Sequence, residues 1–348
     1  MAYTAIDDPS AHFQVNAYSG ASNPQTITNG GNSDLQPDFV WQARRDSSAS
    51  FYLLDSTRGV NSTLFSDTNA VEDTATGYFA SFNSDGFTTG SDSALAYSGR
   101  TYVAWQWKAN GGTTSSNTSG TITSTVQANT TAGFSIVSYV GAGDTTVSTI
   151  GHSLGAVPDM IIVKSRTDDE SWMVYHQSMG NGKKLYLDLN IVAATSGQWN
   201  DTTPTSTLFT TTGDATNDSG DNVIAYCFTS IQVYSKFGGY TGNGNADGPF
   251  VYLGFRPTYV LVKCIDVEES WYVWDTKRST YNLVDDILNP HINNAESVNA
   301  DRAIDVLSNG FKLRGTNTAT NGDDDTYVYA AFAENPFVTS GGVPCTAF

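Results

Sequence analysis

Short apolar runs recur along the whole chain, and Gly, Pro, Asn or Asp bounds most of them. The runs are rich in β-branched and aromatic residues, which favour the pleated, half-buried surface of a strand. No stretch keeps a helical period. Residues 281–288, with Leu283, Ile287 and Leu288, come closest and predict one or two helical turns at most. The pattern therefore predicts an all-β fold.

One set of landmarks occurs three times along the chain. Each copy has a Tyr-x-Gly motif, a proline that opens an apolar run, an aromatic residue fourteen positions after that proline, and a closing apolar run. Ordered landmarks at matched offsets indicate an internal triplication. The three sets are Tyr18, Pro37, Phe51 and 102–107; Tyr139, Pro158, Trp172 and 223–228; and Tyr240, Pro257, Trp271 and 327–332.

The triplication divides the chain into units of about 100 residues, which is the size of single domains rather than of solenoid turns. The strand pattern predicts three tandem antiparallel β-sandwich domains, of jelly-roll or lectin-like type. Between the first two units the chain is almost wholly Gly, Thr, Ser and Asn, a composition typical of linkers. The predicted organisation is repeat 1 at 1–108, a linker at 109–130, repeat 2 at 131–234, repeat 3 at 235–336 and a C-terminal tail at 337–348.

Two of the predicted strands are apolar on both faces, namely 172–175 and 271–274. A strand that covers a single core alternates apolar and polar positions, so these strands need cover on their outer face as well. That cover comes either from the same chain or from another subunit. Because repeats 2 and 3 join directly, we expect them to form a rigid pair that carries the main homo-oligomer interface, with repeat 1 freer on its linker.

Charge excludes two classes of partner. The chain has 17 Lys and Arg against 35 Asp and Glu, a net charge of −18. Nucleic-acid phosphates and anionic lipids both require basic surfaces, so we expect neither nucleic-acid nor membrane binding. There is no apolar run of about 18 residues to span a bilayer, and the opening residues lack the features of a signal peptide.

Candidate catalytic residues form no recognisable pattern. The four histidines, His12, His152, His176 and His291, lack the partners of a metal or nucleophile motif, and isolated surface or loop histidines are the favoured interpretation. Cys227 and Cys264 lie in apolar runs and predict small buried side chains, and Cys345 predicts a free thiol in the tail. We therefore predict no enzyme activity and no cofactor, although a glycosidase carboxylate pair needs only spatial proximity.

Acidic clusters in one loop of repeats 2 and 3 are the candidates for metal binding. Carboxylates from one loop can hold Ca²⁺, but the spacing matches no Asp-x-Asp-x-Asp-Gly loop, and repeat 1 has only Asp46 there. A solvated hairpin tip is therefore the favoured interpretation, and no metal site is predicted. The calcium candidates are Asp168, Asp169 and Glu170 in repeat 2, and Asp266, Glu268 and Glu269 in repeat 3.

Four stretches of the chain, 3–10, 105–113, 234–244 and 330–337, resemble a family found in tailed bacteriophages, especially phages of marine bacteria. Its members carry labels such as virion structural protein or tail fibre, and the resemblance covers essentially the whole chain. It implies a triplicated β-repeat virion protein that is made in the host cytoplasm and released by lysis without a signal peptide. No catalytic residues carry over, because the family has none assigned.

Three functions follow as expectations. The first is an exposed virion appendage, such as a tail fibre or receptor-binding protein, which attaches to host-surface glycan and to other virion proteins and is a trimer if it forms a fibre. The second is a capsid decoration or head-fibre protein built from the same parts. The third is a tail-associated glycan depolymerase, which requires two carboxylates facing one groove.

Overall fold

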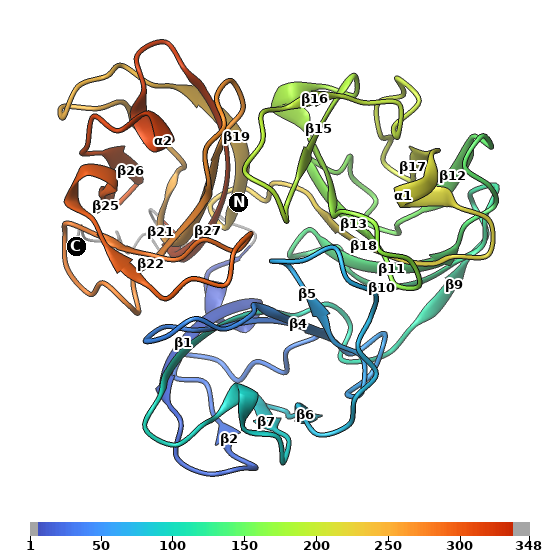
Figure 1. The fold of residues 1–348 in the computed structure, drawn as a ribbon, viewed down its shortest axis with the longest axis horizontal. Helices are drawn as coiled ribbons and strands as arrows, with labels where there is room; N and C mark the ends of the chain where they lie inside the picture. The colour runs from blue at the N-terminus through green and yellow to red at the C-terminus, as the bar shows by residue number, and fades with distance from the viewer. Residues whose placement is uncertain (1–5, 337–348) are drawn as a thin grey trace.

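The computed structural model describes residues 6–336 as an almost entirely β chain (Figure 1). The predicted all-β fold is confirmed. The two α-helices within this described range are single turns, α1 (Asp214–Asn217) and α2 (Thr318–Asn321). The helical turns predicted at 281–288 are wrong, because that segment forms β23 (Asp286–Ile287) and buries Val284, Ile287 and Leu288, while Leu283 stays exposed. The predicted tail at 337–348, with Cys345, lies outside the described residues.

The strands of residues 6–336 form three groups that follow one another along the chain, and none of the sheets in this range mixes strands of different groups. We call the groups lobes 1, 2 and 3. Lobe 1 has a main sheet in the order β1 (Phe13–Ser19), β8 (Thr101–Trp107), β3 (Phe39–Arg44), β4 (Tyr52–Asp55) and β5 (Leu64–Phe65), and a second sheet of β2 (Thr26–Ile27), β7 (Phe87–Thr89) and β6 (Phe79–Phe82).

Lobes 2 and 3 repeat this strand order. The main sheet of lobe 2 has β11 (Phe134–Val140), β18 (Asn222–Phe228), β13 (Met160–Ser165), β14 (Met173–His176), β15 (Lys183–Tyr186) and β16 (Ala194–Thr195), with β12 (Ser148–Gly151) and β17 (Leu208–Thr211) as its second sheet. The sheets of lobe 3 are β19 (Ser235–Thr241), β27 (Thr326–Pro336), β21 (Phe255–Cys264) and β22 (Trp271–Asp275); β20 (Phe250–Tyr252), β26 (Gly310–Leu313) and β25 (Ile304–Leu307); and β23 with β24 (Ser297–Val298).

Strand register confirms the equivalence of the copies. The antiparallel pairing of the third and fourth strands of each main sheet joins Phe39 to Asp55, Met160 to His176 and Tyr259 to Asp275. The aromatic landmarks Phe51, Trp172 and Trp271 are all buried where the fourth strand begins. The matched sequence offsets therefore correspond to matched positions in the sheets.

The segment predicted as a flexible linker, residues 109–130, contains two strands. These are β10 (Ser124–Asn129), which pairs with β11, and β9 (Ser115–Asn117), which pairs with β10. Thr and Val both favour strands, and Val126 and Gln127 are buried. The linker interpretation is wrong because it rested on the Gly, Thr, Ser and Asn content and gave no weight to this short alternation.

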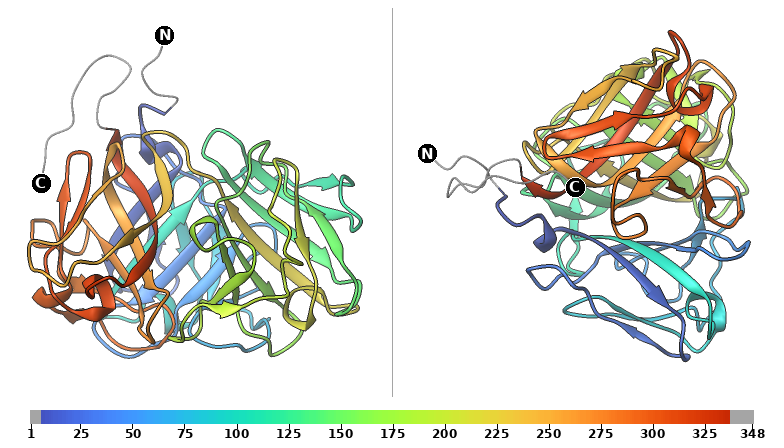
Figure 2. Two further views of the ribbon diagram at one scale, coloured as in Figure 1. Left: turned by 90° about the horizontal axis from the view of Figure 1, so that it is seen from above. Right: turned by 90° about the vertical axis from the view of Figure 1, so that its left-hand side faces the viewer.

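The three main sheets face a common centre (Figure 1), and the side view shows lobe 1 lying directly against lobe 3 (Figure 2). Aromatic side chains of all three lobes fill this centre. The ring centroids of Phe39 and Tyr226 are 4.4 Å apart, those of Phe13 and Phe332 are 4.9 Å apart, and those of Phe228 and Phe332 are 6.1 Å apart.

This central cluster covers the outer face of the two-faced apolar strands. Of the two sources of cover considered from the sequence, the same chain is the one observed. The expectation that lobe 1 is freer than the others is wrong, because its main sheet contributes to the cluster as fully as the other two. Each fold unit therefore buries two surfaces, one within its lobe and one at the centre.

Candidate functional site

Contacts between lobes repeat in a cycle. A backbone N–H of each lobe donates to the carbonyl that follows the third main-sheet strand of the next lobe. The three bonds are Glu72 to Arg166 at 2.8 Å, Ala193 to Ile265 at 3.0 Å, and Glu296 to Arg45 at 2.8 Å. Lobe 1 thus contacts lobe 2, lobe 2 contacts lobe 3, and lobe 3 returns to lobe 1, which gives the chain approximate threefold symmetry.

Charged side chains are buried where lobe 1 meets lobe 2. Asp55 and Arg58 form an ion pair with both side chains fully buried, and the Tyr226 hydroxyl of lobe 2 donates to the Asp55 carboxylate at 2.8 Å. Arg58 also reaches Glu72 at 2.9 Å, and Glu72 pairs with Arg166 of lobe 2 at 2.6 Å. Burial opposes ionisation of Glu72, but Arg166 and Arg58 hold its pKa below the usual range.

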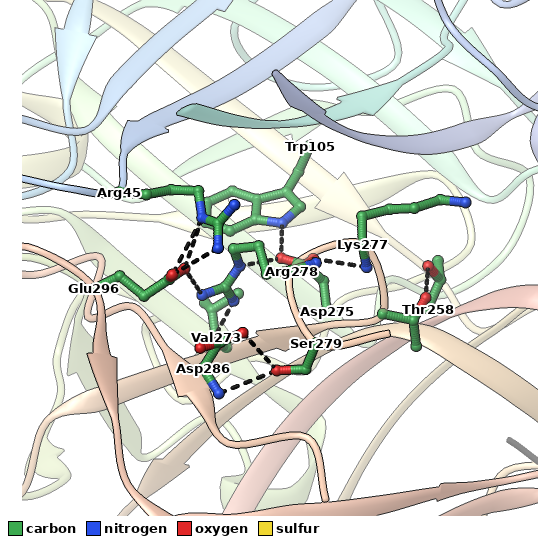
Figure 3. Close-up of polar contacts among 11 residues, drawn as sticks. Arg45, Trp105, Thr258, Val273, Asp275, Lys277, Arg278, Ser279, Asp286 and Glu296 are labelled. Carbon is green, nitrogen blue, oxygen red and sulfur yellow. Dashed lines mark hydrogen bonds and ion pairs between the residues drawn. The ribbon is translucent and has the colours of Figure 1, made fainter. Parts of the chain in front are cut away.

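The contact between lobes 3 and 1 has the same chemistry (Figure 3). Asp275 and Arg278 form the equivalent fully buried pair, and Trp105 Nε1 of lobe 1 donates to the Asp275 carboxylate at 3.0 Å. Arg278 donates to Glu296 at 2.9 Å, and Glu296 pairs with Arg45 of lobe 1 at 2.7 Å. These charged groups are therefore occupied in holding lobes together.

Uncharged groups replace these charges between lobes 2 and 3. His176 stands at the position of Asp55 and Asp275, and its Nε2 lies 3.2 Å from the Tyr329 carbonyl. Burial lowers the pKa of His176 to about 4, so the ring is neutral at pH 7. Met179 stands where the arginine would be, and it packs against the central cluster.

Three of the four histidines, His12, His152 and His291, lie in loops or turns as predicted, whereas His176 ends β14 (Met173–His176); the predicted exposure is wrong for most of them. His152, His176 and His291 are buried, and only His12 is partly exposed. Burial lowers the pKa of all four. The sequence offered no signal for this, because the residues that enclose each ring are distant along the chain.

Two buried lysines lie beside the acidic loops. Lys164 Nζ donates to the Asp168 carbonyl at 3.0 Å as well as to the carbonyl of the residue next to it, and its lobe 3 equivalent, Lys263, donates to the Cys264 carbonyl at 2.6 Å. Burial lowers the pKa of both lysines to about 8, which leaves them mostly protonated at pH 7. Lobe 1 has Ala43 in place of the lysine and only Asp46 in the equivalent loop. The buried lysine and the acidic loop are therefore both present in lobes 2 and 3 and both missing from lobe 1.

The calcium candidates of lobe 2 point in different directions. Asp168 lies within 4.8 Å of Asp218 and Asp221, counted between carboxylate oxygens, whereas Asp169 accepts the backbone N–H of Val71 in lobe 1. Burial raises the pKa of Glu170. The grouping of Asp168 with Asp218 and Asp221 was not predicted, because the two partners come from the loop before β18.

The candidates of lobe 3 do not converge either. Asp266 accepts the Thr326 N–H at 2.7 Å, Glu269 accepts the Thr318 hydroxyl at 3.0 Å, and Glu268 is exposed. An acidic cluster alone does not make a metal site, and the lysine ammonium groups already supply positive charge beneath both loops. The arrangement does not bring the six predicted carboxylates into one coordination sphere.

Two grooves lie between lobes at equivalent positions, each along the first strand of a main sheet. The β1 groove, between lobes 1 and 3, has a volume of about 410 Å³. The β19 groove, between lobes 3 and 2, has a volume of about 520 Å³. The β1 groove is bordered by Gln14, Val15, Ala17, Gly31, Lys277 and Glu334; the β19 groove by Asp159, Gln177, Gln232, Lys236, Phe237 and Tyr252.

The β19 groove combines an exposed ring with polar groups. The Tyr252 side chain is 57% exposed, and Phe250, two residues earlier on β20, is 45% exposed. Lys236 Nζ donates to the Tyr252 carbonyl at 2.6 Å and lies 5.6 Å from the centre of its ring. Asp159 and Gln177 provide a carboxylate and an amide from lobe 2. Aromatic surface with a few polar groups is the usual composition of a small-ligand site.

Sequence reasoning did not identify the grooves, because each combines residues of two lobes. No helix within residues 6–336 is long and apolar enough to cross a membrane.

A family profile described as Domain of unknown function (DUF7483) matches residues 8–336. No curated protein and no solved structure matches the chain. The matched range includes all three lobes together with β9 and β10, so the family is defined by the entire threefold arrangement rather than by one repeat. The chain belongs to the DUF7483 domain family.

Proposed function

We propose that this chain is a virion structural protein of a tailed bacteriophage, exposed as a tail fibre or receptor-binding protein that attaches to host-surface glycan. The observation that carries the glycan proposal is the β19 groove, where the Lys236 ammonium lies 5.6 Å from the centre of the exposed Tyr252 ring and Gln177 also lines the groove. Aromatic rings pack on apolar faces of a ligand, while amide and charged groups bind hydroxyls.

The distribution of charge supports a binding rather than a catalytic role. The buried carboxylates at two lobe contacts, Asp55 and Asp275, are paired with Arg58 and Arg278 and hydrogen-bonded across the contact. A general acid or base must instead reach a substrate with a pKa near the working pH. The resemblance to phage virion proteins and the net charge of −18 support the same proposal.

Binding of purified host envelope polysaccharide tests the proposal. We expect the wild-type chain to bind it, and Tyr252→Ala to weaken binding about tenfold through loss of ring contact. The matched control is Tyr97→Ala, since Tyr97 is a similarly exposed tyrosine (51%) on lobe 1. Equal binding by both variants, or none by the wild type, would contradict the proposal. Release of sugar in the same assay would instead indicate a depolymerase.

A capsid decoration or head-fibre protein is the second candidate, and the threefold arrangement of the lobes favours it. A chain that presents three similar faces about one axis suits a threefold position on a capsid shell. Antibody labelling of intact particles separates the candidates, because label at the tail supports the first and label over the head supports the second.

We also propose a homo-oligomer, a trimer if the chain forms a fibre. Its interface must lie outside the central cluster, because the two-faced apolar strands are already covered within the chain. Light scattering on the full chain measures the oligomeric state directly, and a monomer at micromolar concentration would contradict this part of the proposal.

A further inference from the structure

The first strands of the three main sheets differ in what lies along their outer edge. β1 and β19 are the last strands of their sheets, whereas β11 is followed by β10 and then β9. These three strands are equivalent, because each pairs in the same register with the second strand of its sheet. One of three equivalent edges is therefore filled by the chain itself.

Residue pairing shows how β10 occupies the edge of β11. Gln127 of β10 pairs with Ile136, and its side-chain amide donates to Ser56 Oγ at 2.9 Å and to Thr57 Oγ1 at 2.7 Å in lobe 1. Its amide oxygen accepts the N–H of Gly112 at 2.9 Å. The added strand is thus held by the sheet on one side and by the neighbouring lobe on the other.

The β1 groove is the equivalent space between lobes 1 and 3. Val15 of β1 lies two residues after the strand's first residue, as Ile136 does in β11. Lys277 lies two residues after Asp275, as Thr57 lies two residues after Asp55. Val15 and Lys277 both line this groove. The positions that hold β10 in lobe 2 therefore recur here, with no strand of the described chain between them.

The backbone of β1 has free groups on this side. The His12 carbonyl accepts the Lys108 N–H, and the Gly20 N–H donates to the Arg100 carbonyl. Because hydrogen-bonded positions alternate along an antiparallel pair, the even-numbered residues of β1 bond to β8 and the odd-numbered residues do not. By this parity Val15 and Ala17 direct their N–H and C=O groups outward, and no residue among 6–336 forms a hydrogen bond with them across the free edge.

The edge of β19 differs in this respect. The Phe237 N–H donates to Ser230 Oγ at 3.2 Å, and the Phe237 carbonyl accepts Gln177 Nε2 at 2.9 Å. Side chains thus already satisfy the backbone position of β19 that corresponds to Val15. Within residues 6–336, the β1 edge is the one left open to another strand.

We propose that the β1 groove binds an extended, uncharged segment of a partner protein, which adds a strand to the main sheet of lobe 1 as β10 adds one to lobe 2. The segment should alternate hydroxyl or amide residues with small aliphatic residues, as Thr125, Val126 and Gln127 do. An uncharged segment fits because the carboxylate at the groove is already paired: Glu334 forms an ion pair with Arg256 at 3.0 Å and lies 3.9 Å from Lys277. Main-chain hydrogen bonds supply affinity in this mode of binding.

The probe is a synthetic peptide of residues 121–129, the segment that fills the equivalent edge. We expect hydrogen exchange of the backbone amides in residues 13–17 of the full chain to slow at least about tenfold when the peptide is bound. The same peptide with Thr125→Pro is the control, because proline removes a donor and disrupts the added strand. No change in exchange at 13–17 with saturating peptide would overturn the proposal.

A variant of the groove gives an independent readout. Ala17→Pro removes the outward N–H but leaves the β1–β8 hydrogen bonds, since edge strands tolerate proline there. We expect it to weaken peptide binding about tenfold, while Ala17→Ser, which keeps the N–H, binds as the wild type does. If Ala17→Pro does not fold, the hydrogen-exchange measurement on the wild-type chain with the peptide tests the proposal by itself.

Two other occupants would show themselves in the same experiments, and either would overturn the proposal. Peptide binding that requires removal of residues 337–348 would assign the groove to the chain's own tail. Concentration-dependent self-association that Ala17→Pro abolishes would assign it to a second copy.

Discussion

Removing the Arg278 guanidinium should destabilise the protein, because Asp275 would then be a buried carboxylate without its ionic partner. Both side chains are fully buried, and Arg278 also donates to Glu296 and to the Val273 carbonyl at 2.8 Å. Breaking a buried ion pair by removing one partner costs about 3–5 kcal/mol. Asp275 retains the hydrogen bond from Trp105, so the loss in the free energy of unfolding caused by Arg278→Met should lie near the lower end of this range, at about 3 kcal/mol.

Urea unfolding followed by tryptophan fluorescence measures this loss. The matched control is Lys277→Met, the neighbouring residue, whose side chain is 49% exposed. Because exposed ion pairs contribute little, that control should change the free energy of unfolding by less than about 1 kcal/mol. The comparison separates loss of the buried pair from loss of one positive charge on an acidic protein.

The double variant Asp275→Asn with Arg278→Met tests the cause. Asparagine keeps an acceptor for Trp105 Nε1 but carries no charge, so the double variant should be more stable than Arg278→Met alone, by about 1–2 kcal/mol. Lobe 2 already has an uncharged arrangement here, with His176 and Met179. A double variant no more stable than Arg278→Met, or a single variant that costs less than about 1 kcal/mol, would refute the reasoning.

Three further results are expected. His176 is neutral in the folded protein, because burial lowers its pKa from the ordinary 6.5 to about 4. Its contribution to the free energy of unfolding is therefore fully present above pH 6.5, and about 3 kcal/mol of it is lost by pH 4. Urea unfolding at several pH values measures this loss, which His176→Gln should remove. EDTA should leave the melting temperature unchanged, because Lys164 and Lys263 neutralise the acidic loops; a drop of several degrees would reveal a bound cation. A chain that starts at Thr131 should aggregate in light scattering, because the central rings of lobes 2 and 3 lose their cover; a stable monomer would contradict this.

Local patterns carried the prediction of the fold. The fourteen-residue spacing from Pro158 to Trp172 spans one hairpin, so it is fixed by the length of the strand and of the turn. The same spacing therefore recurs in each lobe that contains this hairpin. The two-faced apolar strands also revealed that each sheet packs on a second surface. Both features depend on residues close together in sequence, which is why the sequence alone could establish them.

Features that join distant segments could not be predicted in the same way. Arg45 pairs with Glu296 across 251 positions, and no pattern near either residue identifies the other. The grooves likewise combine strands of two lobes. Segment 109–130 was misjudged because the short alternation in β10 was given no weight, and because the partners of β10, which are β11 and, through Gln127, lobe 1, could not be read from the segment itself.

The distribution of charge among the three lobe contacts follows the connections of the chain. Lobes 2 and 3 are joined by the short segment 229–234, which places their sheets side by side, and their contact is uncharged. The other two contacts join segments that the chain does not hold close, and these contain the buried pairs at Asp55 and Asp275.

A buried charge requires an opposite charge across the contact, because an uncharged neighbour leaves it unpaired at a cost of several kcal/mol. Lobes with similar strand order could otherwise exchange places around the centre, since the aromatic surfaces they offer are alike. We infer that the ion pairs fix which lobe contacts which, whereas the aromatic centre supplies most of the stability. On this account, Arg58→Met should weaken the contact of lobe 1 with lobe 2 as Arg278→Met weakens its contact with lobe 3, and Met179→Arg should destabilise the uncharged contact by burying a guanidinium beside the neutral His176.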